Sequence, residues 1–337
     1  LIPHYLNFIN GIVNADNLPM ILSRVLFQSN TILKAIREII VKSIFEMLEE
    51  FSKDYEGYIH FYLYFKEKLK TGFINDSCNR WKFSKLFRYH TSKSDGTMIS
   101  LSDYVYRMKE QQQYIYYMTG HNWSDMENSA YVEMLMKKDL EVIYMTDEID
   151  EWCLEHLQDF DGKTLMAVNS VDLVLPQDDD EVQTFKQNET SLKNLCSFIK
   201  DIVEEKVEEV VVSKRMVTRA ACIVTARGAL SGNKKRIMNL KSLSEWHNSD
   251  GIRQTYTNKV ILEINPSESF IRKLQDQLNG DSCELLMKVD VQTMCDSAMF
   301  DAGLLSDVHL FSELLLKKMY AVVSNFNKEM NTKPDTL

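Results

Sequence analysis

A cysteine and a histidine that lie close together in the sequence are the first candidates for chemistry. Cys153 and His156 are three residues apart in a stretch with helical periodicity, so their side chains would share one helix face. A thiolate beside an imidazole can act as a nucleophile with its general base, or supply two ligands to a metal ion. Four apolar residues line the same side of the predicted helix: Ile149, Trp152, Leu157 and Phe160. Because buried cysteine behaves as a small hydrophobe, core packing is the favoured interpretation and chemistry at this pair is the alternative.

A second candidate is the Gly-Lys-Thr of a phosphate-binding loop, which occurs here at Gly162-Lys163-Thr164. That loop needs another glycine five residues earlier, where this chain has Leu157. The segment also follows a predicted helix and precedes a predicted strand, the reverse of the order that directs backbone N–H groups at phosphate. The sequence therefore predicts a turn here.

No other group of residues has the spacing of a metal site. The six cysteines form no C-x-x-C pair, and the seven histidines form no H-E-x-x-H motif. The cysteines are Cys78, Cys153, Cys196, Cys222, Cys283 and Cys295. We expect neither a metal site nor a disulfide framework, and a reducing compartment fits this usage.

Arg24 is the remaining candidate, because it follows a loop that contains Pro19 and precedes an apolar helical pattern. A guanidinium held there can present a planar fork to a phosphate or a carboxylate. On the residues alone, a salt bridge is the favoured role.

The elements that would position these residues follow from periodicity. Apolar residues spaced three or four apart predict a long helix over 33–51, and an aromatic-rich stretch predicts a second over 57–69 that Gly72 ends. From residue 114 onward, strands at 114–118, 141–145 and 164–168 alternate with helices near 124–138 and 147–160. This order predicts a small parallel sheet with right-handed crossovers.

The acidic stretch around 176–190 contains a proline and few apolar residues, which indicates a linker. Beyond it we predict an α+β region with a helix at 191–206, strands at 207–213, 222–225 and 260–264, and three further helical stretches. The last two helices carry apolar stripes: Met287, Val291, Met294 and Ala298 on one, and Val308, Phe311, Leu315, Met319, Val322 and Phe326 on the other. These stripes favour equally a self-associating four-helix bundle and packing within the chain.

Composition restricts the function classes. The chain has 337 residues, a net charge of −10, 11 Gly and 5 Pro, as expected of a helix-rich globular protein of two or three domains. Its negative charge disfavours nucleic acid and acidic membrane surfaces as partners. The sequence shows no signal segment and no run of 18 uncharged apolar residues, so we expect a soluble, cytoplasmic fragment.

Several segments, read in order, resemble the heat-shock protein 90 chaperones. Leu18-Pro19, Ser23-Arg24 and Gln28 resemble the catalytic loop of that family's middle domain. The resemblance continues through 86–92 (LFRYHTS), 101–108 (LSDYVYRM), 115–120 (IYYMTG), 144–165 (YMTDEIDEWCLEHLQDFDGKTL), 236–238 (RIM) and 262–266 (LEINP). It is strong to about residue 168 and weaker afterwards.

The resemblance implies an α+β and α/β multidomain fold. Residues 1–173 would be the C-terminal part of the middle domain, helical over 24–110 with an αβα parallel-sheet subdomain over 114–170. Residues 174–190 would be an acidic linker, and 191–337 an α+β dimerisation domain that ends in amphipathic helices.

The resemblance also implies function. The family comprises ATP-dependent, homodimeric chaperones that bind partly folded client proteins and co-chaperones. ATP, with Mg²⁺, is bound by an N-terminal domain that precedes this chain, so no complete active site is expected here. Arg24 matches the residue that reaches the γ-phosphate, which makes it the predicted catalytic and cofactor-binding residue, and Gln28 is its predicted assistant.

Departures from the family pattern define an alternative function. Ile21 and Val25 replace residues that are typically Asn and Glu in the loop, and Asp290, Gln292 and Thr293 make the first terminal helix more polar. The chain also ends Pro334-Asp335-Thr336-Leu337, without the acidic tail that binds tetratricopeptide co-chaperones. A degenerate or truncated paralogue that acts only as a scaffold or heterodimerisation module is therefore the alternative.

Overall fold

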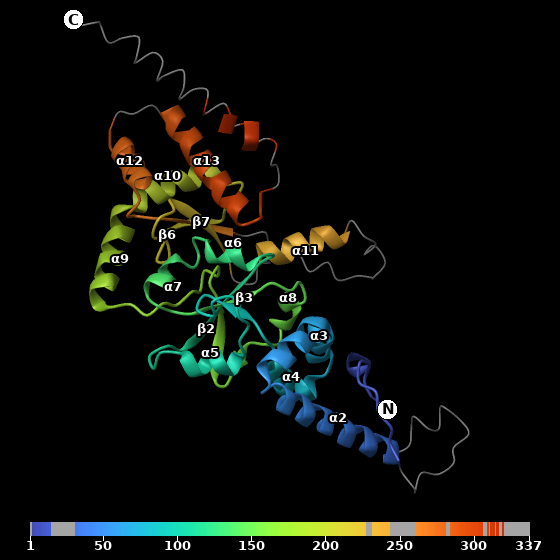
Figure 1. Ribbon diagram of the computed structural model, residues 1–337. Coiled ribbons are helices and arrows are strands. Elements are labelled where there is room, and N and C mark those ends of the chain that lie inside the picture. Colours follow the sequence, from blue (N-terminus) through green and yellow to red (C-terminus); the bar gives the residue numbers. More distant parts are fainter. Residues whose placement is uncertain are drawn as a thin grey trace, which may run out of the picture. The chain divides into compact units, whose positions relative to one another are not determined.

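The computed structural model describes residues 2–14, 31–226, 231–242, 260–280 and 284–305, together with residues 309, 311–313, 315, 316 and 319. The chain divides into two compact units. Unit 1 comprises Leu1–Met126 and Leu140–Met166, and unit 2 comprises Glu127–Asp139 and Ala167–Leu337. Each unit contains a small sheet and several helices (Figure 1).

Unit 1 begins with helices, most of which contribute side chains to one apolar core. They are η1 (His4–Leu6), α2 (Thr31–Phe51), α3 (Tyr55–Asn75), η2 (Ser77–Asn79), α4 (Arg80–Leu86) and α5 (Leu101–Arg107). The predicted helix over 33–51 is confirmed as α2, which buries Val41, Ile44 and Phe45 in that core. The Asp54 carboxylate accepts from the Gly57 N–H and so caps the start of α3.

The predicted end of the second helix at Gly72 is wrong, because α3 continues to Asn75. Gly72 instead lies inside the helix, where a Cβ atom would overlap the ring of Phe83 and lie 2.9 Å from that of Tyr5. This glycine therefore permits close packing of α3 against its neighbours and does not terminate it.

The sheet of unit 1 has five strands in the order β1-β3-β2-β5-β4. The strands are β1 (His90–Thr91), β2 (Tyr114–Thr119), β3 (Val142–Met145), β4 (Asp159–Phe160) and β5 (Lys163–Ala167). The predicted parallel pairing is confirmed for β2 and β3. The pairs β1–β3 and β4–β5 are antiparallel, so the sheet as a whole is mixed. The predicted turn is confirmed at Asp161-Gly162, both with positive φ (50° and 73°), between β4 and β5.

The two helices that were predicted near 124–138 and 147–160 are shorter in the structure than in the prediction. The stretch 124–138 forms α6 (Trp123–Glu127) and α7 (Glu133–Lys137), and 147–160 forms only α8 (Asp150–Cys153) before β4. Apolar residues with helical spacing can also be buried by a turn, so the spacing predicted longer helices than the structure has.

Unit 2 has a three-stranded sheet, ordered β6-β8-β7, with helices packed against it. Its elements are α9 (Asp179–Ser191), α10 (Lys193–Val203), β6 (Glu209–Val212), β7 (Ala221–Thr225), α11 (Gly232–Ser242), β8 (Val260–Ile264), α12 (Ser269–Leu278) and α13 (Glu284–Asp301). The predicted linker contains helix α9, which begins with a capping box between Asp178 and Glu181. The division into domains at 174–190 stays a prediction.

The apolar stripe of α13 packs inside unit 2. Met287, Val291, Met294 and Ala298 belong to the core formed with α10 and the sheet. For this first stripe, packing within the chain accounts for the apolar spacing. In the second stripe, the structure describes Phe311, Leu315 and Met319, while Val308, Val322 and Phe326 lie outside the described residues.

Candidate functional site

The predicted catalytic residues Arg24 and Gln28 lie outside the described residues, as do Ile21 and Val25. The structure does describe the chain on both sides of this segment, at residues 2–14 and from Thr31 onward. These flanking elements are the described parts of the chain that would position the predicted loop.

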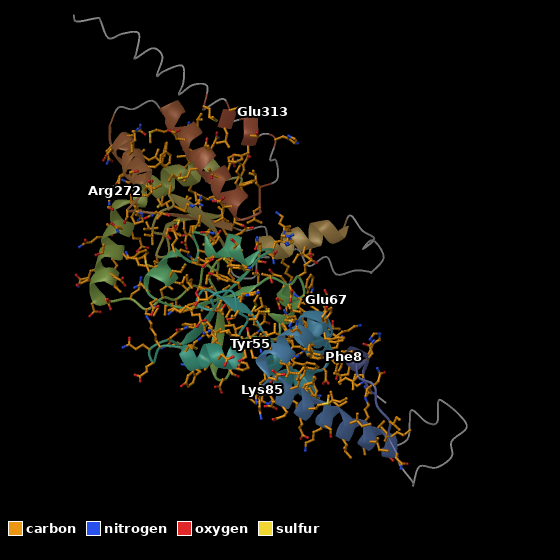
Figure 2. All side chains as sticks on the ribbon, in the orientation of Figure 1. Phe8, Tyr55, Glu67, Lys85, Arg272 and Glu313 are labelled. Atoms are coloured by element: carbon orange, nitrogen blue, oxygen red, sulfur yellow. The ribbon has the colours of Figure 1, made fainter. Side chains whose placement is uncertain are left out.

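The N-terminal side is held by aromatic packing and one hydrogen bond. Leu6 is fully buried, and the Tyr5 hydroxyl donates to the carboxylate of Asp76 at the end of α3. The ring of Phe8, which is labelled in Figure 2, stacks on that of Phe65 with 4.6 Å between centroids. Residues 4–8 are therefore attached to α3.

The C-terminal side is held at the far end of α2. There the buried Arg88 guanidinium donates to the carbonyls of Ser52 (3.2 Å), Lys85 (3.1 Å) and Phe87 (2.9 Å). It also lies 4.5 Å from the centroid of the Tyr58 ring. The planar guanidinium of Arg88 thus donates both to the carbonyl that follows α2 and to a carbonyl in the last turn of α4.

A buried ion network lies between α3 and the start of α8. The Lys70 ammonium is 2.7 Å from the Asp147 carboxylate and 2.6 Å from that of Asp150, and Lys66 forms a further ion pair with Asp147. Tyr89 presents its ring 4.9 Å from the same ammonium. Lys70 and Asp150 are both almost completely buried.

The charges of this network control one another's protonation. Burial alone would lower the pKa of Lys70, but the carboxylates of Asp150 and Asp147 raise it above its ordinary value. Burial raises the pKa of Asp150, whereas Lys70 and Lys66 together overcome burial and lower the pKa of Asp147. The network is therefore a structural ion cluster that keeps its lysine charged.

Cys153 and His156 do not form a reactive pair in this structure. Cys153 is buried in the core of unit 1, its thiol faces the Lys70 carbonyl at 3.9 Å, and burial raises its pKa to about 12. His156 is exposed. A thiol that stays protonated near neutral pH is a poor nucleophile, so core packing, the favoured interpretation, accounts for Cys153.

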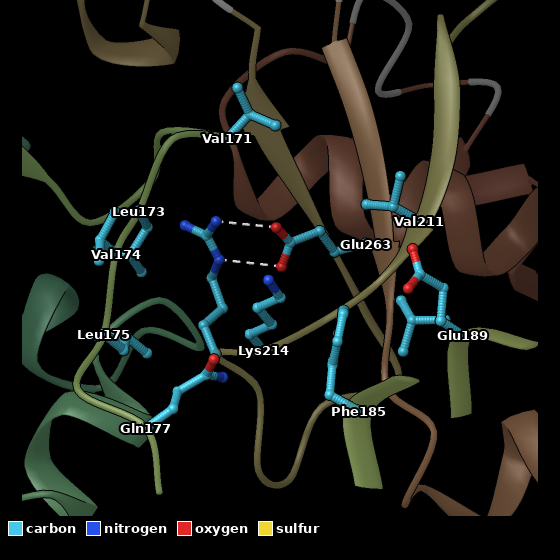
Figure 3. Close-up of a pocket in the computed structure, with 12 residues that line it drawn as sticks. Val171, Leu173, Val174, Leu175, Gln177, Phe185, Glu189, Val211, Lys214 and Glu263 are labelled. Carbon is cyan, nitrogen blue, oxygen red and sulfur yellow. Dashed lines mark hydrogen bonds and ion pairs between the residues drawn. The ribbon is translucent and has the colours of Figure 1, made fainter. Parts of the chain in front are cut away.

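Unit 2 contains a cavity of about 310 Å³ beside a buried ion pair (Figure 3). Arg215 donates to both carboxylate oxygens of Glu263, at 2.9 Å and 2.8 Å, and also to the carbonyls of Val168 and Ser170. Lys214 places its ammonium 4.4 Å from the ring of Phe185, at the wall formed by α9. The cavity is lined by apolar side chains and by two cations and two carboxylates, so it presents no net charge that would select a ligand.

Sequence reasoning missed both buried ion pairs. Their partners lie 48 to 80 positions apart, and a single lysine or arginine in a helical or strand pattern gives no local sign of them. Among the described residues, no group of three or more His, Cys, Asp or Glu is arranged to hold a metal ion. No helix among the described residues is long and apolar enough to cross a bilayer.

These two units define the class of protein: a multidomain chain of mixed α+β architecture. A family-wide sequence model described as Hsp90 protein matches residues 1–336. The chain belongs to the Hsp90 family.

Curated relatives agree with this assignment. The chain is 31% identical to an endoplasmin homolog of Arabidopsis thaliana over 90% of its own length and 39% of the relative's. It is 33% identical to the chaperone protein HtpG of Myxococcus xanthus (90% and 45%) and 33% identical to that of Shewanella loihica (95% and 49%). The chain thus spans half or less of the length of these relatives.

Proposed function

We propose that this chain is the part of an ATP-dependent molecular chaperone that binds unfolded or partly folded client proteins, recruits co-chaperones and dimerises. The observation that carries the proposal is the match to the Hsp90 family over residues 1–336. ATP and its Mg²⁺ would be held mainly by a separate ATPase domain, to which this chain contributes a loop. The proposed location is the cytoplasm.

The proposed contribution to ATP hydrolysis is the guanidinium of Arg24, assisted by Gln28. A cation that reaches the γ-phosphate neutralises the charge that develops during phosphoryl transfer. Such a group must be positioned by the elements on either side of its loop. The attachment of Tyr5 and Phe8 to α3 on one side, and of α2 to the core on the other, supports this requirement.

The proposed dimer contact lies among the last described residues, which are 309, 311–313, 315, 316 and 319. Leu315, Leu316 and Met319 are 39%, 49% and 63% exposed, in contrast to the buried stripe of α13. Three large apolar side chains exposed within five residues favour association with another chain.

The second candidate function is a scaffold or heterodimerisation module without a catalytic role. The apolar residues Ile21 and Val25 favour it, because neither can donate or accept a hydrogen bond that would orient Arg24.

One experiment separates the two functions. A functional N-terminal ATPase domain of the family is added to this chain, and ATP turnover is compared between the unchanged protein and Arg24→Ala. Loss of an arginine that contacts the transferring phosphoryl group should lower turnover about 10³-fold or more. The matched control is Arg37→Ala, an exposed arginine on α2, which should leave turnover unchanged. Equal turnover in all three proteins would favour the scaffold.

A further inference from the structure

Residues 127–139 interrupt unit 1 in sequence but fold as part of unit 2. They lie between β2 and β3, which are parallel neighbours in the sheet of unit 1. The Tyr131 hydroxyl donates to the carbonyl of Ile223 on β7 of unit 2. Val132 and Leu135 are completely buried. We call residues 127–139 the insertion.

Two charged side chains attach the insertion to other parts of unit 2. The carboxylate of Glu133 accepts from the backbone N–H groups of Val217 and Thr218, each at 2.9 Å, and from the Thr218 hydroxyl. The Lys138 ammonium lies 2.6 Å from the carboxylate of Glu181 on α9. A carboxylate that accepts three hydrogen bonds is a strong anchor, because charged acceptors bind more tightly than neutral ones.

The chain is equally fixed where it re-enters unit 1. Met126 and Leu140, the residues on either side of the insertion, are each 3% exposed. The next residue, Glu141, receives hydrogen bonds on its carboxylate from Arg107 (2.6 Å) and from the hydroxyl of Thr91. Its carbonyl accepts from the Tyr104 hydroxyl at 2.6 Å. No free linker therefore separates the insertion from β3.

The remaining crossing, between residues 166 and 167, leads directly into an anchored segment of unit 2. Val168 is completely buried, and Arg215 donates to its carbonyl and to that of Ser170. The chain therefore passes between the units three times, and anchored residues lie within a few positions of each crossing.

We propose that the insertion couples the local stability of unit 2 to that of the β2–β3 pair in unit 1. Opening of the β2–β3 pair requires its connecting chain to move, and that chain is the insertion, which unit 2 holds. A change that loosens the anchors in unit 2 should then loosen β2 and β3. Thermodynamic linkage requires that a change which loosens β2 and β3 also loosens the anchors in unit 2, with the same coupling free energy.

Hydrogen–deuterium exchange of the intact chain, read by mass spectrometry, tests the coupling. Glu133→Ala should speed exchange by about tenfold both in residues 217–225 and in β2 and β3, since a lost charged hydrogen bond changes a local opening equilibrium by that order. Lys137→Gln, an exposed lysine on the same helix α7, should change neither region. Peptides from α3 serve as the internal reference.

The reciprocal variant distinguishes coupling from local damage. Arg107→Gln releases Glu141 in unit 1 and should also speed exchange in residues 217–225. If each variant affects only its own unit, the insertion is merely attached to unit 2 and the proposal is overturned. Tyr131→Phe, which removes one hydroxyl and keeps the ring, gives the same readout if Glu133→Ala does not fold.

Discussion

Replacement of Lys70 by methionine should destabilise unit 1 more than the same replacement of an exposed lysine. The variant removes the ammonium between Asp147 and Asp150 and leaves two carboxylates close together in a buried position. Among the described residues, Lys66 is then the remaining ion-pair partner, and it bonds Asp147. Methionine keeps most of the side-chain volume, so the effect reports on charge and not on a cavity.

The expected magnitude follows from the burial of the pair. Removal of one partner of a buried ion pair typically costs about 3 to 5 kcal/mol, because the other charge stays buried without compensation. For a folding unit of about 150 residues this corresponds to a fall in melting temperature of roughly 6 to 20 °C. The matched control is Lys42→Met, whose exposed ion pair with Glu46 at 3.8 Å should contribute less than about 1 kcal/mol.

The effect should also depend on pH. In the unchanged protein the pKa of Asp147 is lowered, so its contribution to stability is present above its unfolded pKa and is lost as pH falls through its folded pKa. In Lys70→Met, burial raises the pKa of Asp150 with no ammonium to oppose it, so the folded state takes up a proton more readily than the unfolded state. The difference in stability between the two proteins should therefore shrink between pH 7.5 and about pH 5.

Urea unfolding followed by tryptophan fluorescence measures the difference in the free energy of unfolding between the two proteins. The probes for unit 1 are Trp81, Trp123 and Trp152, which all lie in it. A second variant, Lys70→Met with Asp150→Asn, should recover part of the lost stability, since it removes one uncompensated charge. A cost below about 1 kcal/mol for Lys70→Met, or a cost that does not change with pH, would refute the reasoning.

Three further predictions concern other parts of the chain. Arg215→Leu should lower the stability of unit 2 by about 3 to 5 kcal/mol in thermal unfolding, because Glu263 stays buried without its partner. Gly162→Ala should cost about 1 to 2 kcal/mol in the same assay, since open space surrounds its Cβ position and only the left-handed backbone resists the substitution. Leu315→Asp with Met319→Asp should shift sedimentation of the chain from dimer to monomer, and an unchanged sedimentation coefficient would place the contact elsewhere.

Local patterns predicted the local parts of the fold. The spacing that begins at Leu33 gave the helix α2, and Asp161-Gly162 gave the turn between β4 and β5, because both depend on residues that are neighbours in sequence. The helix α9 within the acidic stretch was not predicted, although Asp178 and Glu181, three apart, have the spacing of a capping box.

Contacts between distant residues could not be predicted. A lysine in the helical pattern of α3 suggests a solvated face, and nothing near Lys70 in sequence indicates Asp147 or Asp150. The antiparallel pairing of β1 with β3 is likewise set by tertiary packing and not by the two residues of β1. For Arg24 and Gln28 the predicted roles come from the family resemblance, and they stay predictions.

The attachment of α2 at one end has a mechanical consequence. The helix has 21 residues, its residues in the core of unit 1 run from Ile40 to Phe51, and the Ser52 carbonyl directly after it accepts from Arg88. At 1.5 Å per residue the helix is about 32 Å long, so a tilt of about 5° about its C-terminal end, near Arg88, displaces the Thr31 end by about 3 Å. That displacement is as large as the donor–acceptor distance of a hydrogen bond, so a small adjustment beneath Arg88 is sufficient to make or break a contact at Thr31.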